Sequence, residues 1–208
     1  MSETGYRYKD VLYALAVAKA YNQHLGKIQL QKYIYLADTL APIWNLISGD
    51  RYRTYKNGPY DRNIQNAVDV FAFRGAVTIV KSDFHAADSI HVSYEISDIG
   101  QQIVVRLREQ PEFSKKLELY EILGKYINKR GWNNLMTLVY SEPTFVSSKG
   151  EGYGVHLGLD SLLTNETLQI LLGFNTLFKD NPSRLGKKSL VSIFFQLLDN
   201  YQILTKGG

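Results

Sequence analysis

The sequence predicts an α+β fold that is mostly α, with an N-terminal module over residues 1–110 and an all-helical C-terminal region over residues 111–208. Three observations support this prediction. Apolar residues recur at helical spacing along most of the chain, two β-rich runs lie close together before residue 97, and the chain after Pro111 is almost wholly helical in pattern. Helices followed by a β-hairpin and a further helix are typical of a winged helix-turn-helix-like module, with the hairpin as its wing.

Three helices are expected before the hairpin. The first covers residues 8–24, and the second begins near Ile28 and carries a wide apolar stripe. Pro42 lies inside this stripe and should kink or split the second helix, because proline removes a backbone hydrogen bond and clashes with the preceding turn. Residues 52–56 should form a short strand, and Asp61 is well placed to cap a third helix that stops before residue 75.

The wing is expected from two runs with β-branched residues, AVTIV (76–80) and SIHVSYEI (89–96). The polar stretch from Ser82 to Asp88 would join them as a loose hairpin. Ser97 should cap the next helix, because a serine side chain can accept a hydrogen bond from the first free backbone amides.

After Pro111, one helix is expected around residues 119–126 and another around residues 132–139. EPTFVSSKGEGYGVHLG (142–158) has no periodicity and predicts a loop. Two last helices follow, separated by Asn181-Pro182. The final helix carries an apolar stripe that predicts either core packing or, if exposed, a partner-binding surface; its candidate residues are Leu190, Phe194, Leu197 and Tyr201.

Composition limits the function classes. The 208 residues include 24 Lys and Arg against 20 Asp and Glu, a net charge of +4, so a nucleic-acid surface would have to arise by local clustering. The absence of cysteine excludes disulfides, thiolate zinc sites, iron–sulfur clusters and a cysteine nucleophile. The polar start MSETGYRYKD is no signal peptide, and no apolar run approaches the roughly 20 residues of a membrane span. A cytoplasmic protein without a membrane partner is expected.

Motifs for catalysis or metal binding are not recognisable. The four histidines lack metal-site spacing, GEGYG (150–154) lacks the Gly-Lys-Ser/Thr ending of a phosphate-binding loop, and Gly-x-Ser-x-Gly does not occur. The sequence therefore predicts no catalytic residue, no metal, no cofactor and no enzymatic activity.

A basic, aromatic stretch, YRTYKNGPYDRNIQNA (52–67), is the first candidate for contact with double-stranded DNA. Its cations and the one just before it could meet phosphates, together with backbone amides at the start of the third helix. These residues are Arg51, Arg53, Lys56 and Arg62. The alternative is a strand-turn-helix corner in which the tyrosines pack and the cations are solvated.

The start of the second helix is the other candidate for DNA contact, because helix-turn-helix proteins place base-reading side chains there. Lys27, Gln31 and Lys32 are expected to face outward together. No Arg or Asn accompanies them, which disfavours sequence-specific reading.

Three stretches resemble a known family. IQLQKYIYLAD (28–38) is similar to the helix with a Lys-Leu-Gln-Lys start in the Panacea antitoxin domain and its winged-helix relatives, and YKNGPYD (55–61) resembles the Gly-Pro turn that follows that helix. YEISDIGQQIV (94–104) resembles the closing strand and helix of such modules. The resemblance covers about residues 10–110.

In domain order, length and its Pro-Thr-Phe segment, the chain resembles the middle component of ABC-three-component defence systems of the Lamassu type. The resemblance implies a non-catalytic accessory subunit of an anti-phage complex, which docks on an SMC-like ABC ATPase alongside an effector subunit and could assist contact with DNA. Two alternatives remain open. One is a Panacea-like antitoxin or chaperone module that neutralises a toxin, and the other is a winged-helix DNA-binding regulator.

Overall fold

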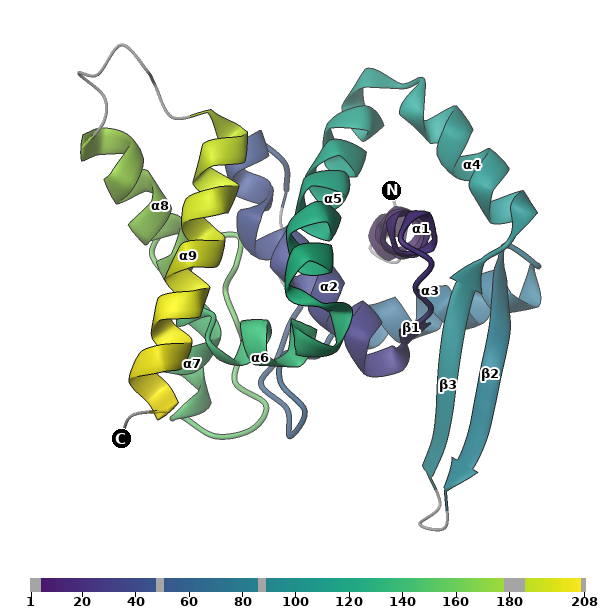
Figure 1. The fold of residues 1–208 in the computed structure, drawn as a ribbon, viewed down its shortest axis with the longest axis horizontal. Coiled ribbons are helices and arrows are strands. Elements are labelled where there is room, and N and C mark those ends of the chain that lie inside the picture. Colours follow the sequence, from purple (N-terminus) through teal and green to yellow (C-terminus); the bar gives the residue numbers. More distant parts are fainter. Residues whose placement is uncertain (1–4, 48–50, 86–88, 178–185, 207–208) are drawn as a thin grey trace. The chain divides into compact units, whose positions relative to one another are not determined.

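The computed structural model describes residues 5–47, 51–85, 89–177 and 186–206 (Figure 1). As predicted, the fold is α+β and mostly helical, with a small three-stranded antiparallel sheet. Contacts divide the chain into two compact units, each built from two stretches: Met1–Ile34 with Asp61–Gly124, and Tyr35–Tyr60 with Lys125–Gly208. The predicted domain boundary after residue 110 falls inside the first unit.

The first unit contains the sheet and five helices or parts of helices. In chain order these are α1 (Gly5–Ala20), β1 (Leu25–Gly26), the first half of α2 (Lys27–Leu40), α3 (Arg62–Phe73), β2 (Val77–His85), β3 (Ser89–Ile96), α4 (Asp98–Arg108) and most of α5 (Pro111–Arg130). The strand order is β1-β3-β2, with both pairs antiparallel. Helix α1 is central: it contacts α3, α4 and β3, and all its residues from Val11 to Leu15 are buried.

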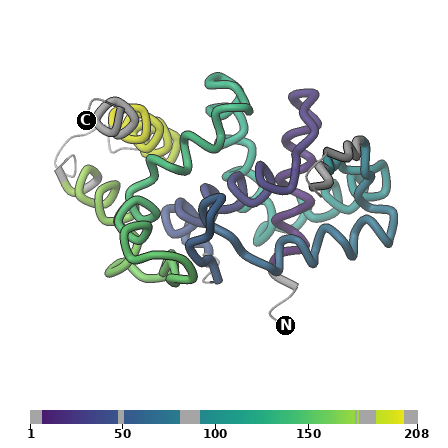
Figure 2. Tube along the Cα trace, turned by 90° about the horizontal axis from the view of Figure 1, so that it is seen from below, coloured from purple at the N-terminus to yellow at the C-terminus, as the bar shows by residue number. Residues whose placement is uncertain are grey.

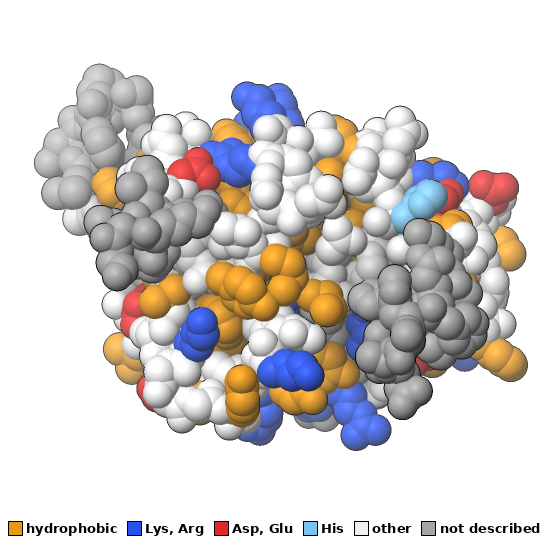
Figure 3. Space-filling model, turned by 60° about the horizontal axis from the view of Figure 1, so that its bottom comes forward, with side chains coloured by type: hydrophobic (Ala, Val, Ile, Leu, Met, Phe, Trp, Pro, Cys, Tyr) orange, Lys and Arg blue, Asp and Glu red, His pale blue; other side chains and the backbone are white. Residues whose placement is uncertain are grey.

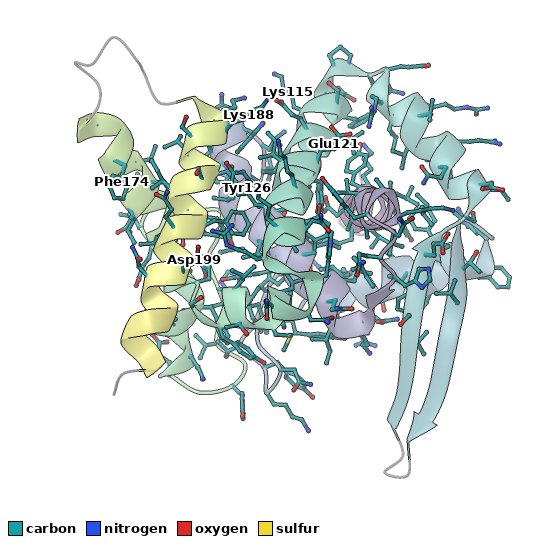
Figure 4. All side chains as sticks on the ribbon, viewed as in Figure 1. Lys115, Glu121, Tyr126, Phe174, Lys188 and Asp199 are labelled. Carbon is teal, nitrogen blue, oxygen red and sulfur yellow. The ribbon has the colours of Figure 1, made fainter. Side chains whose placement is uncertain are left out.

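The second unit is helical. It holds the remainder of α2, the short 3₁₀ helix η1 (Ala41–Trp44), the end of α5, η2 (Trp132–Asn134), α6 (Leu135–Tyr140), α7 (Pro143–Lys149), α8 (Glu166–Leu177) and α9 (Lys187–Lys206). Figure 2 shows the same path as a tube. The end of α5 packs on α9 through a stack of Tyr126 on Phe195, with ring centroids 5.1 Å apart, and Arg130 pairs with Asp199 (Figure 4). The stacked rings give these two helices a defined register.

The predicted caps of two helices and the predicted break of α2 near Pro42 are confirmed. The Asp61 carboxylate caps α3 by accepting from the Asn63 amide at 2.8 Å, and the Ser97 hydroxyl caps α4 by accepting from the Gly100 amide at 3.2 Å. Helix α3 ends before Gly75, which has φ +73°, a conformation that glycine adopts without steric cost. As expected, α2 gives way near Pro42 to a 3₁₀ turn.

Four expectations about local structure are wrong. Residues 82–85 are strand and not loop, because the polar end of β2 pairs with β3 as far as His85. Residues 52–56 form no strand, and only Arg53 makes isolated bridges. Residues 143–149 form α7, because Glu142 caps a short helix that lacks a visible period. Helix α1 ends at Ala20, short of residue 24. The Asn181-Pro182 separation lies outside the described residues.

Among the helices in the described part of the chain, none is both long and apolar enough to cross a membrane.

Candidate functional site

Two of the motif stretches meet in the first unit through one glutamine. The side-chain amide of Gln31 donates from Nε2 to the backbone carbonyl of Asp61 at 2.8 Å, and its Oε1 accepts from the Asp61 backbone amide at 3.0 Å. This paired arrangement satisfies both main-chain groups of a buried residue, much as a neighbouring strand would. Gln31, in the stretch 28–38, is therefore bonded to the last residue of the stretch 55–61, and these bonds fix the start of α3.

A buried ionic cluster surrounds the same position. The Asp61 carboxylate accepts from Arg7 Nε at 2.6 Å and from the Asn63 amide, while Arg7 Nη1 donates to Asp10 at 3.2 Å. Lys116 Nζ lies 2.6 Å from the other oxygen of Asp10. Arg7, Asp10 and Asp61 are all almost fully buried. Since a buried charge is tolerated only when it is paired, these residues are best explained as an internal anchor of the unit.

The Glu-Pro-Thr-Phe segment forms a second buried hub, in the second unit. The Glu142 carboxylate accepts from the Tyr35 hydroxyl at 2.5 Å, from Thr167 Oγ1 at 2.6 Å, and from the amides of Thr144 and Phe145 at 3.1 and 2.8 Å. Burial, with a further contribution from Glu142, raises the pKa of Tyr35 well above its usual range, so the phenol stays a donor. Sequence reasoning missed this hub, although Glu before Pro at a helix start was a usable signal.

The six candidate DNA-contact residues divide between the units. Arg51, Arg53 and Lys56 belong to the second unit, whereas Lys27, Lys32 and Arg62 belong to the first. Five of the six are exposed, and Lys32 is not. On the face drawn in Figure 3, Lys and Arg side chains lie singly or in small groups among hydrophobic and uncharged ones.

The aromatic corner makes contacts within the second unit. Tyr52 is buried and its hydroxyl donates to Asp38 at 3.1 Å, while the rings of Tyr55 and Tyr60 lie 5.7 Å apart. The Arg53 guanidinium donates to the backbone carbonyl of Gly154 at 3.0 Å. These contacts hold the corner within its own unit.

The expectation that Lys32 and Gln31 face outward is wrong, since each side chain is only 2% exposed. The physical reason is that α2 is buried on every side from Leu30 onward, so the helix has no solvent face there. Lys27, one turn earlier, is exposed. Burial lowers the pKa of Lys32 to about 7.

Lys32 should make stability depend on pH. Between pH 7 and about 9.5 the unfolded chain holds this proton and the folded chain has lost it, so the free energy of unfolding should rise with pH, by at most about 1.4 kcal/mol per unit. Urea denaturation at several pH values measures this rise, and the Lys32→Met variant should lack it. Parallel curves for the two proteins would show that Lys32 does not titrate in this range.

The predicted partner-binding stripe of α9 lies largely in the core. Leu190 and Phe194 are buried, Leu197 is partly buried, and the side chain of Tyr201 lies outside the described residues. Core packing, the alternative weighed for this stripe, is what the structure shows for Leu190 and Phe194.

Exposed apolar residues occur elsewhere in both units, for example Leu163 and Tyr153 in the second unit, which are 87% and 77% exposed. Phe73 at the end of α3 is 93% exposed, and Ile99 and Val105 on α4 are each more than half exposed. The exposure of Phe73 could have been predicted from the sequence. Phe73 follows Phe71 by two positions, which turns its side chain about 200° away from the apolar stripe of α3.

A pocket of about 610 Å³ in the second unit lies between α7, α8 and the segment that joins them. Its lining residues include Ser147, His156 and Glu166. The hydroxyl of Ser147 donates to backbone carbonyls of its own helix, at Pro143 and Thr144, and not to a base. The described residues also contain no group of three His, Asp or Glu side chains placed to hold a metal ion.

No family model matches the chain, and no curated protein is significantly similar to it.

Proposed function

We propose that this chain is a non-catalytic accessory subunit that docks on an SMC-like ABC ATPase in an anti-phage defence complex. One observation supports this proposal above the others. The polar residues of the motif stretches, including Gln31, Asp61 and Glu142, bond to groups inside their own units, while large apolar side chains such as Phe73 stand exposed. Such a distribution suits a protein-binding module better than a reaction centre.

The first unit of this subunit is a winged-helix-like module. In support, the chain runs α1, β1, α2, α3, β2, β3, and the short β1 pairs with β3 to give the order β1-β3-β2. The β2–β3 ribbon would be the wing, and α3 would be the helix next to it (Figure 1). Contact with double-stranded DNA is a secondary role, since only two of the three candidate DNA-contact cations of this unit, Lys27 and Arg62, are exposed. An effector subunit completes the proposed complex in the cytoplasm.

Co-expression with an SMC-like ATPase encoded beside this chain, followed by size-exclusion chromatography, tests the proposal. The two proteins should elute together at micromolar concentration, because a stable interface of about 1,600 Å² is compatible with such affinity. Each protein run alone provides the control. Separate elution at this concentration would count against the proposal, and toxicity of the neighbouring gene in the absence of this chain would favour the antitoxin alternative.

A further inference from the structure

The end of α3 and the start of α4 form one rigid junction in the first unit (Figure 1). The Ser97 hydroxyl donates to the backbone carbonyl of Gly75 at 2.6 Å, and the Ser97 amide donates to the carbonyl of Ala76 at 3.1 Å. A Cβ added to Gly100 would collide with the Ala76 carbonyl oxygen, so α4 approaches the turn as closely as its backbone allows. The backbone segments on both sides of this junction are thereby held close together.

One face of α4 continues the exposed end of α3. Ile99, Ile103 and Arg106 follow at i, i+4 and i+7 and so share a face of the helix. This face adjoins the end of α3, because a Cβ on Gly75 would lie 3.8 Å from Cδ1 of Ile99. Phe73 stands two residues before that glycine. The resulting surface, here named the α3–α4 corner, consists of Phe73, Arg74, Ile99, Ile103 and Arg106.

The charges of the corner select the partner. In the described part of the chain, neither Arg74 nor Arg106 makes an ion pair or a side-chain hydrogen bond. Two arginines without an ion pair among the described residues, on a surface that also exposes a phenylalanine and an isoleucine, match a partner surface that combines apolar side chains with carboxylates. Aromatic and arginine residues are also those that most often dominate binding energy in protein interfaces.

A protein fits this surface better than a nucleic acid. Asp69 lies one turn before Phe73 on the same side of α3, and its carboxylate accepts from Gln65 at 2.7 Å. A phosphate backbone laid along α3 would meet this negative charge. A protein segment that puts an apolar side chain on Phe73 and acids on the two arginines avoids it.

We propose that the α3–α4 corner is a docking surface for an acidic, amphipathic segment of a partner protein. This inference rests on the proposed function in one respect, namely that the partner is the ATPase. The backbone beneath the corner is held by the two hydrogen bonds of Ser97, so binding has to order only the exposed side chains of the corner.

A test on the isolated full-length chain uses two synthetic amphipathic helical peptides with leucines on one face, flanked by glutamates in one and by lysines in the other. Fluorescence anisotropy should show tighter binding of the glutamate peptide. Phe73→Ala should weaken it about thirtyfold, the size expected for an interface anchor, and Arg74→Glu with Arg106→Glu should reverse the peptide preference. Val105→Ala on another side of α4 and the charge-matched Lys27→Glu with Arg62→Glu should change affinity less than about threefold.

The outcomes separate the surface from the proposed function. Equal binding of the two peptides, no effect of the corner variants, or tighter binding of a DNA duplex than of the glutamate peptide overturns the inference. The same variants are then used in co-elution with the ATPase. If the wild-type chain and all variants co-elute equally, the corner is not the ATPase interface although the accessory role stands. If the wild-type chain binds the glutamate peptide through the corner but not the ATPase, the proposed partner is wrong and the docking surface stands.

Discussion

Replacing Glu142 by alanine should lower the free energy of unfolding by about 3–5 kcal/mol, because four donors would lose their acceptor inside the protein. Tyr35 and Thr167 would keep buried hydroxyls without this partner, and the first two amides of α7 would lose their cap. The hub contacts residues 107 and 25 positions away in the sequence, so its loss should loosen the second unit as a whole. Urea denaturation followed by far-UV circular dichroism measures the change.

Two control variants sharpen this experiment. Glu142→Gln keeps one acceptor oxygen and should fall between the wild-type and alanine proteins, since its amide group would face donors. Glu118→Ala, on an exposed position of α5, removes the same charge and should stay within about 0.5 kcal/mol of wild type. If Glu142→Ala cost no more than Glu118→Ala, the hub would not stabilise the fold.

Replacing Asp61 by alanine should cost about 3–5 kcal/mol in the first unit, because it leaves the Arg7 guanidinium buried without its 2.6 Å carboxylate partner. The change also removes the cap of α3, which by itself accounts for about 1 kcal/mol. Asp61→Asn retains a cap oxygen and should therefore separate the loss of charge from the loss of the cap.

A double-mutant cycle tests whether the part of this cost that the helix cap does not explain comes from the ion pair with Arg7. In an Arg7→Met background, Asp61→Ala leaves no buried guanidinium without its carboxylate partner. The cost of Asp61→Ala should therefore fall by about 1 kcal/mol or more. Equal costs in both backgrounds would show that the carboxylate acts on stability through the helix cap alone. Chemical denaturation of the four proteins at one pH provides the cycle.

The parts of the fold that could be predicted are those governed by near neighbours in the sequence. Asp61 and Ser97 cap helices through bonds to residues two or three positions on, and Pro42 ends α2 by its own ring. The position of the hairpin followed from β-branched runs. By contrast, α7 was missed because a helix of seven residues shows less than two full periods.

The parts that could not be predicted depend on contacts between distant residues. Lys32 was expected on the surface, since lysine is seldom buried, yet tertiary packing encloses α2 completely at that level. The stripe of α9 was correctly recognised as apolar, but spacing alone does not tell a core face from a docking face. Phe73 shows the converse, an apolar side chain that the period of its helix directs to solvent.

The hydrogen bonds between the Gln31 side chain and the backbone of residue 61 have an evolutionary consequence. The glutamine touches only main-chain atoms there, and every amino acid except proline offers the same amide and carbonyl. The Arg7 side chain, by contrast, donates to the Asp61 carboxylate. In homologous chains, a substitution that removes this carboxylate should therefore be accompanied by a substitution at position 7. Position 31 should keep its glutamine through such exchanges.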